Sequence, residues 1–387
     1  MPTHSTPFPE GSPANVANSG NGSSQATRRS TEFYAPALDG LRCFAVLGVL
    51  FVHFSPTLRG MMDTGSWGVR LFFVLSGFLI TRSLLQTRKH VDAGQTSIQS
   101  ALRAFFIRRI FRLWPVYFFC LAIAYAFNIE LTRQTIWWHL LMASNQYVFH
   151  MQSWSYTGLL SHFWTLAVEQ QFYIFWPFVI LFAPKRRMDL LLLAVLIAGP
   201  FSRELILAMR WSNLVTLYTP LACCLDFFAI GGAVAWGHDE GWLDRFASTL
   251  RLRLLLMLAA GWLLWGTLLL KIDGRYPAHW PVYDPLFQAL GFAALIVYLL
   301  QRPEGLIGRC LRFRAFVYLG EISYGIYIIH NFMHRFGPSL LHHIWGINYF
   351  PNELAHVIYY IALSITAAAA SYHFFEKPVR RWGRRLA

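Results

Sequence analysis

The chain has 387 residues, of which 56% are hydrophobic and only 13% are charged. A soluble domain carries about 25% charged residues, so this composition excludes a water-soluble protein and indicates an integral membrane protein. The net charge of +14 would also suit a nucleic-acid-binding protein. Basic loops on the cytoplasmic side of a membrane explain it better, and we expect no nucleic-acid partner.

The first 33 residues are rich in Pro, Ser, Gly, Asn and Thr, and we expect a disordered cytoplasmic tail there. A signal peptide needs an apolar core near its start, and this stretch contains none, so we expect no signal peptide. The five cysteines form no Cys-x-x-Cys pair, so the sequence predicts neither a disulfide framework nor a metal site.

Ten apolar segments are long enough to cross about 30 Å of hydrocarbon. The predicted spans are 41–58, 68–86, 112–130, 162–183, 188–208, 217–237, 254–271, 284–301, 316–336 and 354–375. The segment 134–150 is shorter and more polar, and the loop charges decide whether it spans. Ten spans with both termini cytoplasmic place most of the 33 basic residues inside, whereas an eleventh span at 134–150 would reverse every later cluster. The sequence therefore predicts an all-α bundle of about ten transmembrane helices, with 134–150 as an outer interfacial or re-entrant piece.

The first span, LDGLRCFAVLGVLFVHF, carries Arg42 and His53 on one face. They are eleven residues apart, which places them within about 20° around the helix and about 16 Å apart along its axis. Asp39 lies near the same face at the inner mouth. Taken alone, Arg42 is explained by a side chain that snorkels to the inner interface, and His53 is explained by a hydrogen bond to a neighbouring helix. Their alignment makes a functional pair the competing hypothesis.

The fourth span, HFWTLAVEQQFYIFWP, carries Glu169 within the apolar region, with His162 on the same face seven residues earlier. If this helix runs inward, Glu169 and His53 lie at similar depths, about 10 Å and about 7–8 Å below the outer surface. The carboxylate could then orient the imidazole or share a proton with it. The alternative is a structural hydrogen bond between helices.

Three further features have plainer explanations. Ser76-Gly77 in the second span favours close helix packing, and the stripe of Tyr324, Tyr327 and His330 in the ninth span is typical of packing or of an interface belt. The basic stretch FIRRIFRLWP gathers Arg108, Arg109 and Arg112 at the inner surface. Topology and anionic lipid explain such a cluster, and a polyanionic ligand such as a nucleotide-bearing cofactor would bind there equally well.

Together these segments resemble acyltransferase family 3, bacterial membrane proteins that O-acylate carbohydrates and other cell-surface molecules. The matching segments, in chain order, are LDGLRCFAVLGVLFVHF, GVRLFFVLSGFLIT, FIRRIFRLWPVY, HFWTLAVEQQFY, ISYGIYIIH and FFEKPVRRW. They extend from residue 36 to residue 382. The resemblance thus implies one transmembrane acyltransferase domain over 34–382, followed by a short cytoplasmic tail at 383–387.

The family implies a multi-pass protein of the bacterial inner membrane, no bound cofactor, and acyl-CoA, with acetyl-CoA expected, as the donor co-substrate. By the resemblance, His53 is the catalytic histidine with Arg42 as its partner, and Arg109 and Arg112 fall on the family's paired inner arginines, with Arg108 beside them. From the residues themselves we add Glu169 to the catalytic candidates.

Two departures from the family pattern stand out. Many members have an arginine just before the Leu-Asp stretch in mid-chain, where CCLDFFAIGG has Cys224. Some members also carry a fused outer esterase-like domain, whereas only ten residues follow Lys377, so we expect transfer without such a domain.

The sequence thus predicts a membrane acyltransferase that moves an acyl group, with acetyl expected, from acyl-CoA to a hydroxyl of a carbohydrate or glycolipid acceptor. The main rival is a polytopic transporter or flippase of lipid-linked sugars, and a catalytically inactive scaffold is a third hypothesis. Transporters often contain inverted repeats with paired broken helices. Only Trp114-Pro115 and Trp176-Pro177 come near such a repeat, and their surroundings differ.

Overall fold

The computed structural model describes residues 35–57, 64–129, 131–153, 158–210, 213–243, 258, 261–262, 279–347 and 349–387. The predicted disordered tail lies outside these ranges, and so does all but three residues of the predicted span at 254–271.

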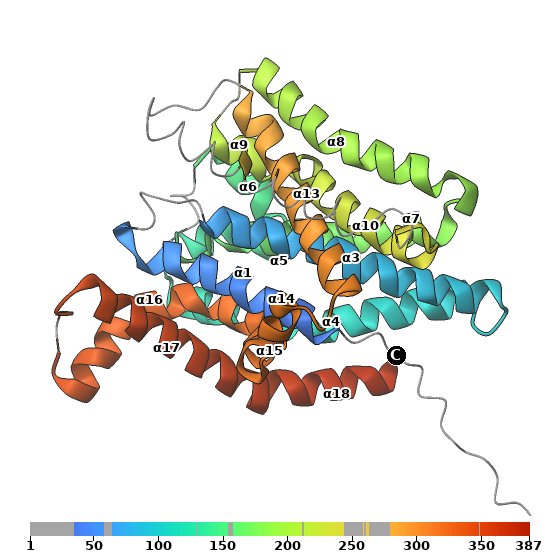
Figure 1. The fold of residues 1–387 in the computed structure, drawn as a ribbon. Coiled ribbons are helices and arrows are strands. Elements are labelled where there is room, and N and C mark those ends of the chain that lie inside the picture. The colour runs from blue at the N-terminus through green and yellow to red at the C-terminus, as the bar shows by residue number, and fades with distance from the viewer. Residues whose placement is uncertain are drawn as a thin grey trace, which may run out of the picture. The chain divides into compact units, whose positions relative to one another are not determined.

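Within the described ranges the chain is helical and has no strand. The first half contains α1 (Pro36–Phe54), α3 (Thr64–Asp92), α4 (Ile98–Ala126), α5 (Thr132–Leu140), α6 (Ser144–Met151), α7 (Phe163–Phe182), α8 (Met188–Ala208) and α9 (Leu214–Tyr218). The second half contains α10 (Leu225–Asp239), α13 (Trp280–Gln301), α14 (Leu306–Leu311), α15 (Arg314–Glu321), α16 (Ser323–Trp345), α17 (Glu353–Ser371), a π-helical turn (Tyr372–Glu376) and α18 (Lys377–Leu386). Figure 1 shows these helices in chain order from blue to red.

Local sequence signals set several helix ends. Helix α1 begins with Pro36, whose fixed φ suits the first helical turn. The side chain of Ser97 caps α4 by accepting a hydrogen bond from the backbone N–H of Ser100, and Asn352 caps α17 in the same way. Helix α16 ends at Trp345, and the following Gly346 adopts the left-handed conformation (φ 67°) that glycine tolerates best.

Seven helices of the described chain are long and apolar enough to cross a membrane. They are Pro36–Phe54, Gly65–Asp92, Phe163–Phe182, Lys185–Ala208, Leu221–Asp239, Trp280–Gln301 and Glu353–Leu386. All seven overlap predicted spans. The predicted span 112–130 falls largely in α4, which continues into the basic segment before it, and 316–336 is divided between α15 and α16 at Ile322.

The segment 134–150 folds as two short helices, α5 and α6, separated by residues 141–143. At 1.5 Å per residue, the nine residues of α5 and the eight of α6 are each far too short to cross the bilayer. This agrees with the prediction that the segment does not span as one helix.

Glycines allow the central helices to approach backbone to backbone. Helices α3 and α10 pack together over much of their lengths (Figure 1). A Cβ on Gly77 would collide with the carbonyl oxygen of Phe228, and one on Gly231 with that of Val74. The Ser76-Gly77 patch is therefore a packing contact at Gly77, as small residues at membrane helix interfaces usually are.

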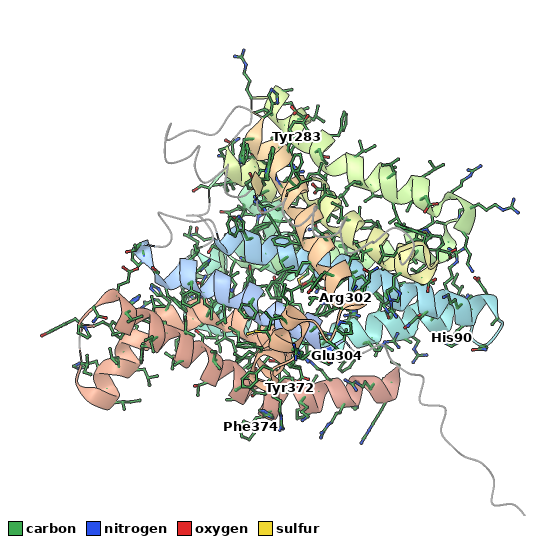
Figure 2. The ribbon with its side chains drawn as sticks, in the orientation of Figure 1. His90, Tyr283, Arg302, Glu304, Tyr372 and Phe374 are labelled. Atoms are coloured by element: carbon green, nitrogen blue, oxygen red, sulfur yellow. The ribbon has the colours of Figure 1, made fainter. Side chains whose placement is uncertain are left out.

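The periphery shows the opposite character. Many large apolar side chains are exposed there, among them Phe374, which is 85% exposed and lies on the outside of the helices in Figure 2. Charged groups lie at the turns on either side of α14: Arg312, which follows α14, donates a 2.6 Å hydrogen bond to Glu304, which precedes it, and this bond lowers the pKa of that carboxyl. Large apolar side chains exposed on the outside of the helices are what a membrane-spanning bundle requires.

Candidate active site

Three histidines and one asparagine meet at the Phe54 end of α1. His53 lies in the last turn of α1, His162 directly precedes α7, and His330 and Asn331 are neighbours in α16. The Nδ1 atom of His53 lies 3.1 Å from Asn331 Oδ1 and 3.1 Å from His330 Nε2. The Nδ2 atom of Asn331 lies 2.9 Å from His162 Nδ1. The four side chains therefore form one continuous polar network.

A cavity of about 500 Å³ opens beside this network. His53, His162 and Asn331 line it, and so do polar and aromatic side chains from α3, α9, α10, α16 and the start of α7. Those other polar and aromatic lining residues are Ser66, Arg70, Phe73, Ser161, Trp164, Tyr218, Phe227 and Tyr327. A concave site of this volume, mostly apolar with a few convergent polar groups, has the dimensions of a small-molecule pocket.

The guanidinium of Arg70 in this cavity is already neutralised. It lies 3.2 Å from Asp284 Oδ2, and its carbon lies 4.7 Å from the ring centroid of Tyr218. Asp284 also accepts a 2.8 Å hydrogen bond from Gln288. The cavity wall therefore carries a compensated ion pair.

A second polar cluster surrounds Glu169 in the interior of α7. Its Oε1 accepts hydrogen bonds from the hydroxyls of Ser76 in α3 and Tyr173 one turn further along α7. The guanidinium carbon of Arg109 lies 5.6 Å from the ring centroid of Tyr173 and 5.6 Å from that of Phe105. Glu169 thus anchors two hydroxyls beside an arginine.

Arg42 joins this second cluster from the first third of α1. It forms a 3.8 Å ion pair with Asp39, one turn earlier, and its guanidinium carbon lies 6.0 Å from the ring of Phe72. Glu169 and Arg112 are both within electrostatic range of Arg42. The predicted alignment of Arg42 and His53 on one helix therefore places them in different clusters, about 16 Å apart along α1.

The predicted pairing of Glu169 with His53 does not occur, because Glu169 bonds to Ser76 and Tyr173. The predicted first span ran to residue 58, whereas α1 ends at Phe54. His53 is therefore nearer the end of its helix than expected, level with His162. Glu169 lies seven residues, or about 10 Å, further along α7.

The three predicted cofactor-binding arginines lie in α4 and differ in their surroundings. Arg109 is half-buried beside Tyr173, whereas Arg108 is exposed. Arg112 is half-buried within electrostatic range of Asp39, Arg42 and Glu376. In the described part of the chain, Arg112 forms no ion pair with a carboxylate, so this cluster has positive charge to offer an anion.

Cys224, where many family members have an arginine, lines the cavity. The nearby Asp226 is fully buried and pairs instead with the equally buried Arg203 of α8, at 2.5 Å between Nη2 and Oδ2. Arg203 also donates to the main-chain oxygens of Cys223 and Val282. The guanidinium of Arg203 therefore neutralises Asp226, and Cys224 forms part of the cavity wall.

Asn331 was not among the predicted functional residues, although it connects His53 to His162. The only signal in the sequence was a polar His-Asn pair inside an apolar span. Across the described ranges, no group of three or more His, Cys, Asp or Glu side chains could hold a metal ion, so we assign no metal to the histidines.

The sequence profile of the acyltransferase domain of acyltransferase family 3 matches residues 36–373. The chain belongs to acyltransferase family 3. As a family member it is 26% identical over 375 residues to O-acetyltransferase OatA of Staphylococcus aureus (strain NCTC 8325 / PS 47). It is also 26% identical over 399 residues to the putative O-acetyltransferase SACOL0978 of Staphylococcus aureus (strain COL).

These alignments cover 90% of this family 3 chain but only 58% of each relative, so the chain spans less than two thirds of their length. No solved structure matches it. The resemblance seen in the sequence is confirmed at the level of the family, and the transporter hypothesis gains no support from the matches.

Proposed function

We propose that this protein is a membrane O-acyltransferase that moves an acyl group, with acetyl expected, from acyl-CoA to a hydroxyl of a carbohydrate or glycolipid. The observation that carries the proposal is the pair of sites on one helix. A pocket beside His53 lies at the Phe54 end of α1, and an arginine-rich cluster around Glu169 lies toward the Pro36 end.

In this proposal the cavity beside His53 holds the acceptor. A sugar presents both hydroxyls and an apolar face, and the cavity offers Ser66, Ser161 and Asn331 together with the rings of Trp164 and Tyr218. Because Arg70 is already paired with Asp284, this ion pair adds no net charge to the pocket. A pocket of this kind suits a neutral sugar. A hydroxyl bound there would lie against the imidazole.

The chemistry assigned to His53 is general base catalysis. The imidazole removes the proton of the acceptor hydroxyl while the hydroxyl oxygen attacks the carbonyl carbon of the thioester. The carbon–sulfur bond then breaks, and the imidazolium returns its proton to the departing thiolate, so an ester and free CoA result. With an unperturbed pKa of about 6.5, histidine performs both transfers near neutral pH.

The arginines of α1 and α4 are assigned to the donor. The phosphates of acyl-CoA need cationic, hydrogen-bonding partners, which Arg108, Arg109 and Arg112 supply. Arg42 is too far from His53 to contact the same atoms, so it belongs with the donor's path, and Glu169 holds Ser76 and Tyr173 in place beside that path.

The same proposal includes ten spans in a bacterial inner membrane with both termini cytoplasmic. It rests on the basic residues of the turns, because ten spans keep Lys185–Arg187 and the basic C-terminal helix α18 on one side together with the α4 arginines. Donor phosphates then meet the arginines from the cytoplasm.

The experiment that tests the function uses purified protein in liposomes with radiolabelled acetyl-CoA and a crude cell-envelope glycan extract. Acceptor-dependent release of CoA, with label recovered as an alkali-labile ester in the glycan, is the expected result. Absence of both from folded protein, with every extract and with longer acyl donors, would contradict the proposal.

A further inference from the structure

The hydrogen bonds around His53 determine where its proton lies, because three main-chain carbonyls fix the partners on either side. A carbonyl oxygen only accepts, so the ring or amide nitrogen facing it must carry hydrogen. The three carbonyls belong to Tyr327, Ile328 and Leu159.

His330 is fixed first. Its Nδ1 lies 2.5 Å from the carbonyl oxygen of Tyr327, so Nδ1 carries the hydrogen of the neutral ring. Its Nε2 then has a lone pair, and that atom lies 3.1 Å from His53 Nδ1. His330 therefore presents an acceptor to His53.

Asn331 is fixed in the same way. Its amide nitrogen donates one hydrogen to the carbonyl oxygen of Leu159, at 3.1 Å, and the other to His162 Nδ1, at 2.9 Å. The Nε2 of the His162 ring donates to Ile328 O at 3.1 Å, so in the neutral ring Nδ1 carries the lone pair and accepts from Asn331, although the Leu159 carbonyl also contacts this ring. Both amide hydrogens are thus used, and the amide oxygen is the atom that faces His53 Nδ1, at 3.1 Å.

His53 Nδ1 therefore faces two acceptors, Asn331 Oδ1 and His330 Nε2, and must be the nitrogen that carries hydrogen. We infer that Asn331 and His330 are positioning residues that hold His53 in its Nδ1–H tautomer, leaving Nε2 as the basic nitrogen for the reaction. This inference rests on the proposed function for its catalytic meaning, although the tautomer itself does not depend on turnover.

The same contacts stabilise His53 after it has taken the substrate proton. The imidazolium is a stronger donor than the neutral ring, so its Nδ1–H bonds to Asn331 and His330 strengthen as the charge develops. A third group that fixes the tautomer and orientation of a catalytic histidine is the usual means of making the imidazole an effective base. Here a neutral amide and a second imidazole take that part.

Other ionisable groups approach the Phe54 end of α1 from each neighbouring helix. They are His162 before α7, Arg70 of α3 with its partner Asp284 of α13, Tyr327, His330 and His334 of α16, and Glu353, His356 and Tyr360 of α17. Helices α14 and α15 meet α1 at Gly40 and Asp39, at its other end. Glu353 bonds to Ser55 and Thr57, and Asp284 to Arg70, so neither carboxylate forms a bond with His53 among the contacts described.

A spectroscopic test reads the tautomer without any turnover. Solid-state NMR of protein labelled with 15N-histidine in liposomes at pH 8 distinguishes protonated from unprotonated ring nitrogens, and the His53 signals are those lost in His53→Ala. We expect a protonated Nδ1 and an unprotonated Nε2 at His53. The reverse assignment would overturn the inference, even in an active enzyme. The expected tautomer in a protein without transferase activity would contradict the proposed function alone.

A kinetic test uses charge at Asn331. In Asn331→Asp a carboxylate faces His53 Nδ1 and favours the charged imidazole, so the acid limb of the kcat/KM profile should move upward by about one pH unit or more. Asn145→Asp is the matched control, because Asn145 is a buried amide of α6 bonded to Gln171 and Thr219, away from the cavity lining. If the acid limb of Asn331→Asp stays at the wild-type pH, residue 331 does not contact His53 Nδ1, and the inference is overturned.

Substitutions at His330 separate positioning from packing. His330→Gln keeps an acceptor near the position of Nε2, whereas His330→Leu fills the site without one. We expect His330→Leu to lower kcat by about tenfold or more with little change in the KM for donor, and His330→Gln to restore part of the loss. Equal activity in the two variants would show that the ring of His330 only fills space.

Discussion

Among single residues, His53 and Glu169 illustrate how far a helix pattern can predict a site. The angle between Arg42 and His53 follows from helix periodicity, and α1 is a continuous helix across both. The depth of His53 relative to Glu169 depended on where α1 ends, and apolar composition alone marks a helix end poorly. The network through Asn331 joins residues more than 160 positions apart, which periodicity along one helix does not reveal.

A first prediction concerns Glu169. In Glu169→Gln the side chain keeps its size but loses the charge that accepts both the Ser76 and Tyr173 hydroxyls beside Arg109. Hydrogen bonds to charged groups contribute about 1.5–3 kcal/mol, so we expect kcat to fall by roughly ten- to a hundredfold. Steady-state turnover of acetyl-CoA measures this. Glu204→Gln is the control, because Glu204 is a half-buried carboxylate of α8 paired with His279, and unchanged turnover in Glu169→Gln would return Glu169 to a structural role.

Among the helices, α1 carries both proposed sites, and its backbone packs closely against those of its neighbours. Gly40 faces the carbonyl oxygen of Leu311, Gly320 of α15 faces that of Asp39, and Gly68 of α3 faces that of Ala45. None of these positions has room for a Cβ without movement of a backbone. Helix α1 is therefore held at its Pro36 end and along its middle, which fixes Arg42 relative to α3.

A second prediction concerns the close backbone packing of α1 at Gly320. Gly320→Ala places a methyl group against the Asp39 carbonyl, and overpacking of this kind costs about 1–3 kcal/mol. Thermal unfolding of the detergent-solubilised protein should show a lower midpoint. Gly65→Ala is the matched control, because a Cβ there would meet Val52 at 3.4 Å, an ordinary contact. Equal unfolding midpoints for both variants would contradict the prediction, because they would show that α15 can shift to accommodate the methyl group without loss of stability.

A third prediction concerns α4. Neutralising Arg109 and Arg112 together, as Arg109→Gln and Arg112→Gln, removes charge that in the proposal binds the donor phosphates. The apparent KM for acetyl-CoA should rise about tenfold or more, since a charge-assisted hydrogen bond is worth at least about 1.5 kcal/mol. Arg186→Gln with Arg187→Gln removes equal charge from an exposed turn and serves as the control. A donor dependence that matches the control would assign the α4 arginines to topology or lipid.

At the scale of the whole molecule, composition predicts the class of fold, and loop charge predicts the direction of each helix. The seven apolar helices found in the described ranges all overlap predicted spans, because about 20 apolar residues in a row have few alternatives to a membrane helix. The division of 316–336 into α15 and α16 at Ile322 was not predicted, although Gly320 and Gly325 flank that residue. The partners of the charged groups depend on how distant helices pack, as with Arg203 and Asp226.

A fourth prediction tests the direction of the chain. Ten spans with a cytoplasmic N-terminus place α18 and the C-terminus inside, where the basic residues of that helix meet anionic lipid. A fluorescent protein that matures only in the cytoplasm, fused after Ala387, should therefore fluoresce. A periplasmic phosphatase at the same position should be inactive. An active phosphatase with a dark fluorescent fusion would reverse the orientation.

The most direct test of the enzyme centred on His53 is acetyl transfer by His53→Ala in liposomes, measured as acceptor-dependent release of CoA. General base catalysis contributes about 10²–10⁴-fold, so we expect the rate to fall at least a hundredfold while the variant still inserts and unfolds near the wild-type temperature. His150→Ala, which alters an exposed histidine of α6, should leave the rate unchanged. Transfer by folded His53→Ala at a rate close to that of the wild type would contradict the account.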